Sequence, residues 1–207
     1  MHTINAFLFD LDGTIWNSEP EIVNSLIQAL SEVEIRQPTR KLILNQLRES
    51  GSPNRVLRQY HVSLSVYWRK YRINCENIEL FFDNTHEIFK ALIDRRRNIG
   101  FVTALKKEHT FKLLHKFDLL RYSDIVITPS DTYKRKPNPG PILEALKHIN
   151  KTGKFNSAIY IGNQESDIIA AKRAGCISCL AAWGTHGNIK EEPDFIINSL
   201  EELIKFT

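Results

Sequence analysis

The chain has 207 residues, of which 42% are hydrophobic and 25% are charged, proportions that are ordinary for a globular protein. This length suits one large domain, or a core domain with a small insertion, that buries its core without disulfides. The formal net charge of +4 is compatible with an anionic substrate, but many proteins without such a substrate are equally basic. Composition therefore excludes a disordered or fibrous chain without indicating a function.

The cysteines and the apolar runs exclude further classes. Cys75, Cys176 and Cys179 are too few and odd in number for a secreted disulfide scaffold. Cys176 and Cys179 have CxxC spacing, but no second pair completes a zinc site, so we interpret them as buried residues of an apolar strand. No apolar run reaches the roughly 18 residues that span a membrane. With no secretory signal visible either, we expect a cytoplasmic protein without a membrane partner.

The first elements in chain order are a strand and a helix. The apolar run Ile4–Leu11 predicts a buried central strand. Ser18 and Glu21 then have the spacing of a capping box, and Pro20 is tolerated in a first helical turn. We expect a helix to begin there, and the pattern stays helical to about residue 74.

After residue 84, predicted helices and strands alternate. Strands are expected at 99–103, 124–128, 158–162, 176–182 and 194–197, and helices at 85–97, 107–117, 139–149, 165–174 and 201–206. This alternation predicts a doubly wound α/β fold, in which helices cover both faces of a parallel sheet. The helical block interrupts it directly after the first strand. We therefore predict a core domain of residues 1–16 and 84–207, with an inserted small helical domain of residues 17–83.

One basic and aromatic cluster, Trp68–Arg72, is a feature of nucleic-acid-binding surfaces. It is short and lies within a predicted helix, so we interpret it as a solvated helix face. We expect no nucleic-acid partner.

Polar side chains follow the predicted strands where each strand ends. They are Asp10, Asp12, Thr103, Lys136, Asn163 and Asp167. Singly, each has a simpler explanation as a turn, a strand end, a solvated lysine or an acid in the first turn of a helix. Parallel strands present their carboxyl ends at one sheet edge. Polar side chains that follow one predicted strand after another therefore favour a common site.

This set of side chains suits phosphoryl transfer. A phosphomonoester dianion repels a carboxylate nucleophile, so a divalent cation and a lysine are needed to cancel charge. Hydroxyl and amide donors stabilise the charge that gathers on the phosphoryl oxygens. Two carboxylates allow one to attack while the other carries a proton.

The motifs that contain these residues resemble those of the haloacid dehalogenase-like superfamily, in its phosphoglycolate phosphatase-like branch. FDLDGT resembles the first motif, FVTA the second, KPNP the third and GNQESD the fourth. The resemblance implies that Asp10 is the nucleophile, that Asp12 is the acid and base, and that Thr103 and Lys136 bind the phosphoryl group. It also implies that the inserted helices form a cap over the site.

The resemblance further implies a magnesium cofactor and a phosphate-binding loop. The implied metal ligands are Asp10, Asp12 through its backbone carbonyl, Asn163 and Asp167. The implied phosphate-binding positions are Leu11, Gly13, Thr103, Ala104 and Lys136.

Two positions depart from the family pattern. Asn163 stands where the family has an acid that ligates magnesium, so a neutral oxygen replaces a charged one and we expect weaker metal binding. Ala104 stands where asparagine or serine is usual, but that position mainly donates a backbone amide.

We expect a magnesium-dependent phosphatase that acts on a small phosphorylated metabolite through an aspartyl-phosphate. One alternative is a phosphomutase of the same superfamily, which retains the phosphoryl group for a second transfer. The other is a non-catalytic binding protein with a weakened metal site, which Asn163 favours and the intact Asp10, Asp12, Thr103 and Lys136 oppose.

Overall fold

The chain folds into two compact units. The computed structural model describes residues 4–32, 38–50, 52–150, 157–185 and 189–207. The first unit comprises Met1–Trp16 and Leu80–Thr207, and the second comprises Asn17–Glu79. The second unit begins where the predicted insertion begins, and it ends before residue 83.

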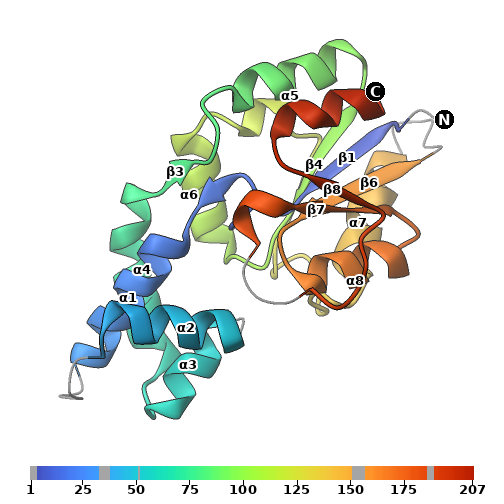
Figure 1. Ribbon diagram of the computed structural model, residues 1–207. Helices are drawn as coiled ribbons and strands as arrows, with labels where there is room; N and C mark the ends of the chain where they lie inside the picture. Colours follow the sequence, from blue (N-terminus) through green and yellow to red (C-terminus); the bar gives the residue numbers. More distant parts are fainter. Residues whose placement is uncertain (1–3, 33–37, 51, 151–156, 186–188) are drawn as a thin grey trace. The chain divides into compact units, whose positions relative to one another are not determined.

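The first unit contains a sheet of six parallel strands in the order β5-β4-β1-β6-β7-β8 (Figure 1). The strands are β1 Ala6–Phe9, β4 Asn98–Val102, β5 Ile125–Ile127, β6 Ala158–Gly162, β7 Ile177–Ala181 and β8 Phe195–Ile197. All four residues of the central strand β1 are buried, as is typical of a strand covered on both faces. The predicted doubly wound α/β fold is confirmed.

Helices cover both faces of this sheet. They are α5 Thr85–Asp94, α6 Lys107–Lys116, α7 Gly140–Asn150, α8 Glu165–Arg173 and the short 3-10 segments η2 Leu120–Tyr122, η3 Ala182–Gly184 and η4 Leu200–Phe206. Helices α7 and α8 contact β4 to β7, while α5 packs against β4 and η4 on the other side of the sheet (Figure 1). The predicted closing helix is therefore present, but as a 3-10 helix.

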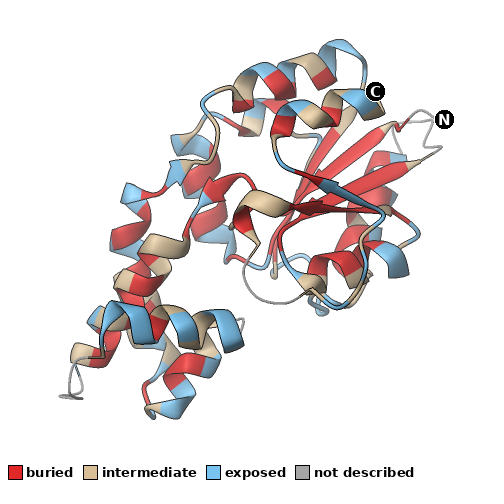
Figure 2. Cartoon of the chain, viewed as in Figure 1, coloured by how far each residue is buried: buried red, intermediate tan, exposed pale blue. Residues whose placement is uncertain are grey.

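The central strands of the sheet are buried along their length (Figure 2), and their side chains alternate between its two faces. Leu8 and Tyr160 belong to the buried cluster that includes residues of α7 and α8. Phe9 faces the other way, where its ring lies 5.2 Å from that of Phe89 on α5. Side chains of one strand thus stabilise both layers, which holds the strand ends in fixed register.

The second unit is helical. Its elements are α1 Glu19–Ser31, α2 Arg40–Ser50, α3 Pro53–Gln59, α4 Leu64–Asn74 and the 3-10 turn η1 Cys75–Asn77. Helix α1 packs against the other three helices, and the buried Asn74 amide donates to Ser25 Oγ at 2.9 Å between α4 and α1. Short strands β2 Trp16–Asn17 and β3 Glu79–Leu80 pair where the chain passes between the units.

Two local predictions in this unit have different outcomes. The predicted capping box is wrong: Ser18 occupies the N-cap position of α1, but its side chain makes no capping hydrogen bond. In the basic cluster, Tyr71 is buried, and Lys70 Nζ pairs with Glu32 at 2.5 Å. The interpretation as a solvated helix face is therefore right for the exposed Arg69 and Arg72 but wrong for Tyr71, whose ring packs in the core of the unit.

The two cysteines with CxxC spacing are buried thiols. Cys179 lies within β7 and Cys176 directly precedes it. Burial raises the pKa of each thiol to about 12, so both stay protonated at neutral pH. Their interpretation as buried apolar residues is confirmed.

The described helices are also informative about membranes. None of them is long and apolar enough to cross a bilayer.

Candidate active site

The strand register brings the predicted site residues to one edge of the sheet. Phe9 of β1 pairs with Phe101 of β4 and with Ile161 of β6. Asp10, Thr103 and Asn163 therefore follow neighbouring strands at their carboxyl ends. All three side chains are buried, with relative exposures of 6%, 5% and 4%.

Lys136 joins this edge from the segment between β5 and α7. Its ammonium lies 2.7 Å from Asp10 Oδ1 and 2.6 Å from Asp167 Oδ1. The same ammonium donates to the Tyr160 hydroxyl at 2.8 Å and to the Val102 carbonyl at 3.3 Å. One lysine thus links the end of β1 with the start of α8.

Burial and these contacts set the charges of the cluster. Burial raises the pKa of Asp10 to about 7, although the Lys136 ammonium acts to lower it, and the Asp167 and Asp12 carboxylates raise it further. Burial alone would lower the pKa of Lys136, but the Asp10 and Asp167 carboxylates outweigh it and raise that pKa well above its usual value. The lysine therefore stays charged, and its single positive charge does not fully offset the negative charge of the neighbouring carboxylates.

The loop after β1 holds Asp12 through a local tryptophan contact. Trp16 Nε1 donates to Asp12 Oδ1 at 2.8 Å, and the Gly13 amide donates to the Trp16 carbonyl at 3.0 Å. Gly13 has a φ of +79°, a left-handed conformation that favours glycine. The chain therefore reverses directly after Asp12, and the Asp12 carboxylate keeps a defined direction.

Asn163, in the loop after β6, forms hydrogen bonds with the loops that follow β1 and β7. Its Nδ2 donates to the Gly184 carbonyl at 2.7 Å, and its Oδ1 accepts from Thr14 Oγ1 at 3.4 Å. A Cβ atom at Gly13 would lie 2.2 Å from Asn163 Nδ2, and one at Gly184 would lie 1.6 Å from the Gly13 carbonyl oxygen. Only glycine at both positions permits this approach, so Asn163 acts as a structural link between loops.

The start of α8 is stabilised by a capping box. Gln164, and not Asn163, is the N-cap of the helix, and it forms a capping box with Asp167. Asp167 Oδ2 accepts from the backbone amide of Gln164 at 3.0 Å, while its Oδ1 forms the ion pair with Lys136. Asp167 therefore stabilises a helix start with one oxygen and enters the site with the other.

The remaining predicted positions lie around this cluster. Thr103 Oγ1 accepts from the Leu105 amide at 3.1 Å, which orients the hydroxyl. The Leu11 carbonyl accepts from the Thr14 and Ile15 amides, and Ala104 is exposed. The predicted phosphate-binding positions thus lie on three segments, the loop after β1, the loop after β4 and the segment before α7.

The donor set fits a hard divalent cation in part. Among the described residues, no group of three His, Cys, Asp or Glu side chains is arranged to hold a metal. Two carboxylates, Asp10 and Asp167, do meet at one lysine, and the buried Asp167 Oδ1 receives no well-aligned hydrogen bond. Carboxylate oxygens are preferred magnesium ligands, and a bound cation would favour the charged form of Asp10, whose pKa is raised by burial first and by the Asp167 and Asp12 carboxylates next.

Several contact residues are absent from the sequence prediction. Tyr160, Val102 and Gly184 reach the site through contacts with residues far away in the chain. Tyr160 carries a sequence signal, because it lies two residues before Gly162 on the strand that leads into the fourth motif. Trp16 carries a weaker one, as an indole donor four residues after Asp12.

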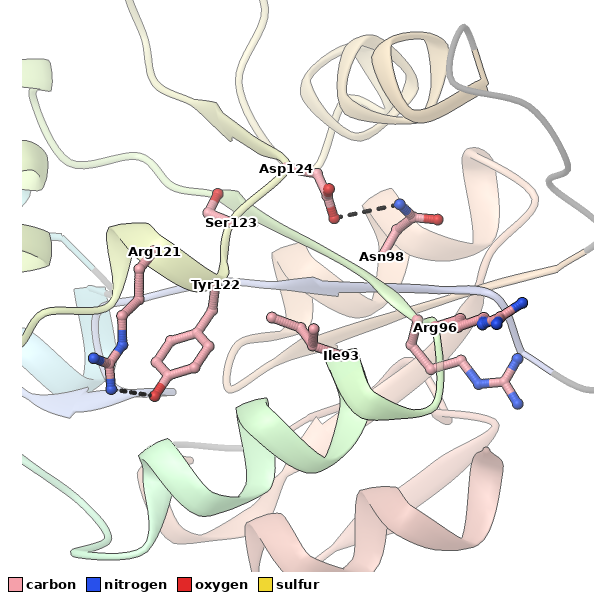
Figure 3. Close-up of a pocket in the computed structure, with 8 residues that line it drawn as sticks. Ile93, Arg96, Asn98, Arg121, Tyr122, Ser123 and Asp124 are labelled. Carbon is pink, nitrogen blue, oxygen red and sulfur yellow. Dashed lines mark hydrogen bonds between the residues drawn. The ribbon is translucent and has the colours of Figure 1, made fainter.

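A separate pocket of about 340 Å³ lies at the opposite end of the strands (Figure 3). Its lining includes Asn98, which begins β4, and Asp124, which precedes β5. Asn98 Nδ2 donates to Asp124 Oδ2 at 3.3 Å, and Arg121 Nη2 donates to the Tyr122 hydroxyl at 2.7 Å. The pocket is therefore distant from the carboxylates of the candidate site.

The geometry at the carboxyl edge is able to support attack by a buried carboxylate next to a fixed cation. Asp10 is such a carboxylate, Lys136 is the cation, and Asp12 is a second carboxylate on the following turn. This arrangement suits transfer of an anionic group from an ester to Asp10.

Comparison with known proteins agrees with this geometry. The family model for haloacid dehalogenase-like hydrolases matches residues 7–181. A pyrophosphatase PpaX from Bacillus pumilus is 26% identical over 98% of this chain and 95% of its own, and one from Listeria innocua is 28% identical over 97% and 95%. A crystal structure from Lactobacillus plantarum, provisionally named a phosphoglycolate phosphatase, superposes with a TM-score of 0.81 at 22% identity, over 99% of this chain and 100% of that one.

Proposed function

The chain belongs to the haloacid dehalogenase-like hydrolase family, and from this premise we propose that it is a magnesium-dependent phosphatase with Asp10 as its nucleophile. The observation that carries the proposal is the Lys136 ammonium, which lies between the buried Asp10 and Asp167 carboxylates at 2.7 and 2.6 Å. A lysine in this position neutralises part of the charge on an incoming phosphate ester and holds the nucleophile in place.

The proposed reaction has two transfers. An Asp10 carboxylate oxygen attacks phosphorus, the bond from phosphorus to the leaving oxygen breaks, and Asp12 gives its proton to that oxygen. Asp12 then takes a proton from water as the water oxygen attacks phosphorus, which releases inorganic phosphate and restores Asp10. Thr103, Lys136 and the loop amides near Leu11 and Gly13 hold the phosphoryl oxygens.

Magnesium is the proposed cofactor. Asp10, Asp167, the Asp12 carbonyl and the Asn163 amide oxygen would hold it, with the two carboxylates supplying the charge. When bound, the ion supplies positive charge that offsets repulsion between the ester and Asp10.

The substrate is a small phosphorylated metabolite in this proposal. Relatives named pyrophosphatases and a structural neighbour named for phosphoglycolate make pyrophosphate and phosphoglycolate the first compounds to test. The helical unit Asn17–Glu79 is proposed to act as a cap that selects among them. A cytoplasmic location is proposed as well, because the three cysteines are present as thiols, the form that a reducing compartment maintains.

Release of inorganic phosphate tests the proposed activity. The protein is assayed with an aryl phosphate, phosphoglycolate and pyrophosphate, in magnesium and in a chelator, beside an Asp10→Asn variant. Magnesium-dependent release that the variant lacks, while its thermal melting is retained, supports the proposal. A binding protein would release no phosphate, and a phosphomutase would require a bisphosphate activator.

A further inference from the structure

A buried tyrosine lies behind the lysine of the site. Tyr160 is fully buried on β6, and its hydroxyl accepts from Lys136 Nζ at 2.8 Å and donates to the Val102 carbonyl at 2.9 Å. Lys136 also approaches the same carbonyl at 3.3 Å. The hydroxyl, the carbonyl and the ammonium therefore all lie within hydrogen-bonding distance of one another.

The direction of each of these hydrogen bonds follows from donor counting. A tyrosine hydroxyl has one proton, and the Val102 carbonyl accepts it, so only a lone pair remains for the ammonium. Burial raises the pKa of Tyr160 well above its usual value, so the phenol keeps that proton. Tyr160 is consequently a fixed acceptor for Lys136.

The ammonium has three protons to share among its neighbours. Tyr160 and Val102 belong to strands of the sheet, β6 and β4, while Asp10 follows β1 and Asp167 lies in α8. A lysine side chain is long and flexible, so contacts with the two carboxylates alone would allow its ammonium to move with them. The tyrosine hydroxyl opposes that movement.

We propose that Tyr160 is a positioning residue that fixes the Lys136 ammonium for catalysis, an inference that rests on the proposed phosphatase function. A preorganised cation stabilises developing charge in the transition state without reorganising during the reaction. Loss of the hydroxyl would let the ammonium move towards the carboxylates and away from a phosphoryl group. We expect loss of the hydroxyl to lower turnover more than it weakens substrate binding.

A purely structural role for Tyr160 is the competing explanation, since its ring belongs to the buried cluster of α7 and α8. Tyr160→Phe keeps the ring and removes only the hydroxyl. Tyr122→Phe is a matched control, because Tyr122 is also a buried tyrosine whose hydroxyl accepts from a cation, Arg121 Nη2 at 2.7 Å. Tyr122 lies before β5, at the other end of the sheet.

Steady-state kinetics and thermal melting form the first arm of the test. Tyr160→Phe is expected to lower kcat by up to about 100-fold, as small misplacements near reacting atoms do, with a smaller change in KM. Tyr122→Phe is expected to keep kcat and to lose a similar amount of thermal stability. An unchanged kcat in Tyr160→Phe, or an equal loss in both variants, overturns the proposal.

The second arm observes the lysine directly and needs no activity. With nitrogen-15 lysine, the buried Lys136 ammonium is expected to give a slowly exchanging NMR signal, which Lys136→Arg assigns by its loss. Tyr160→Phe should shift that signal and speed its exchange with water, and Tyr122→Phe should not. An unchanged signal in Tyr160→Phe overturns the proposal. If the wild-type protein hydrolyses no phosphate ester, the proposed function fails while this arm still tests the contact.

Discussion

At the scale of single residues, the site depends on side chains whose polar atoms already form hydrogen bonds with other residues of the protein. Asn163 is the clearest case, because it replaces a usual metal-binding acid and yet donates to Gly184 at 2.7 Å. A carboxylate there would have no proton to donate to that carbonyl. We therefore expect an aspartate at this position to weaken loop packing and to strengthen metal binding.

Asn163→Asp separates these two effects. We expect the magnesium concentration for half-maximal turnover to fall, because a charged ligand replaces a neutral one. We also expect melting at a lower temperature, since a lost buried hydrogen bond costs about 1–3 kcal/mol. Magnesium titrations of turnover and of melting temperature measure both. Coincident titration curves for the two proteins would refute the ligand role of Asn163.

Sequence reasoning identified the residues that follow strands but not the contacts between them. Asp10, Thr103 and Asn163 are predictable at one edge because parallel strands share their direction. The Tyr160–Lys136 and Asn163–Gly184 contacts depend on how loops from separate strands fold over that edge. No local pattern contains this information, because the partners are distant in the chain.

At the scale of elements, alternating helices and strands were predictable because each pattern has its own period. The predicted Ser18 capping box failed for a different reason: spacing permits such a cap, but backbone geometry decides whether it forms. Ser18 has φ −89° and ψ −11°, which are helical values, whereas capping residues are typically extended. The N-cap of α8 at Gln164, with φ −119° and ψ 154°, does form its box.

The link between β7 and β8 gives a pH-dependent prediction. Asp194 accepts from the Ser178 amide at 2.8 Å and from its hydroxyl at 2.6 Å. Partial burial acts to raise the pKa of Asp194, but these bonds outweigh it and hold that pKa below its ordinary value of 3.8. A lowered folded-state pKa means that the stabilisation is present above about pH 4 and is lost as pH falls through that pKa.

Asp194→Asn should therefore cost about 0.5–1 kcal/mol at neutral pH, a modest value because the residue is exposed. The difference from wild type should shrink below pH 4. Chemical denaturation at pH 7 and at pH 3 measures it, with Glu192→Gln as an exposed control on the same segment. A pH-independent difference would show that the charge of Asp194 is unimportant.

At the scale of the whole molecule, two units share one chain through the paired segments β2 and β3. We expect the unit Asn17–Glu79 to move as one body and to exclude water from the site when a phosphate analogue binds. Spin labels at Glu49→Cys and Lys147→Cys, both exposed, report the distance between units. Magnesium with orthovanadate should narrow the distance distribution, and an identical distribution with and without ligand would contradict a cap.

The central claim is that Asp10 carries the phosphoryl group. The most direct measurement uses Asp12→Ala with an aryl phosphate, rapid acid quenching and mass spectrometry of the peptides. An aryl leaving group needs little protonation, so Asp10 is phosphorylated, whereas the missing base slows hydrolysis and the intermediate accumulates. We predict phosphate on Asp10 in this variant. Phosphate on another residue, or turnover that continues in Asp10→Asn, would contradict the mechanism.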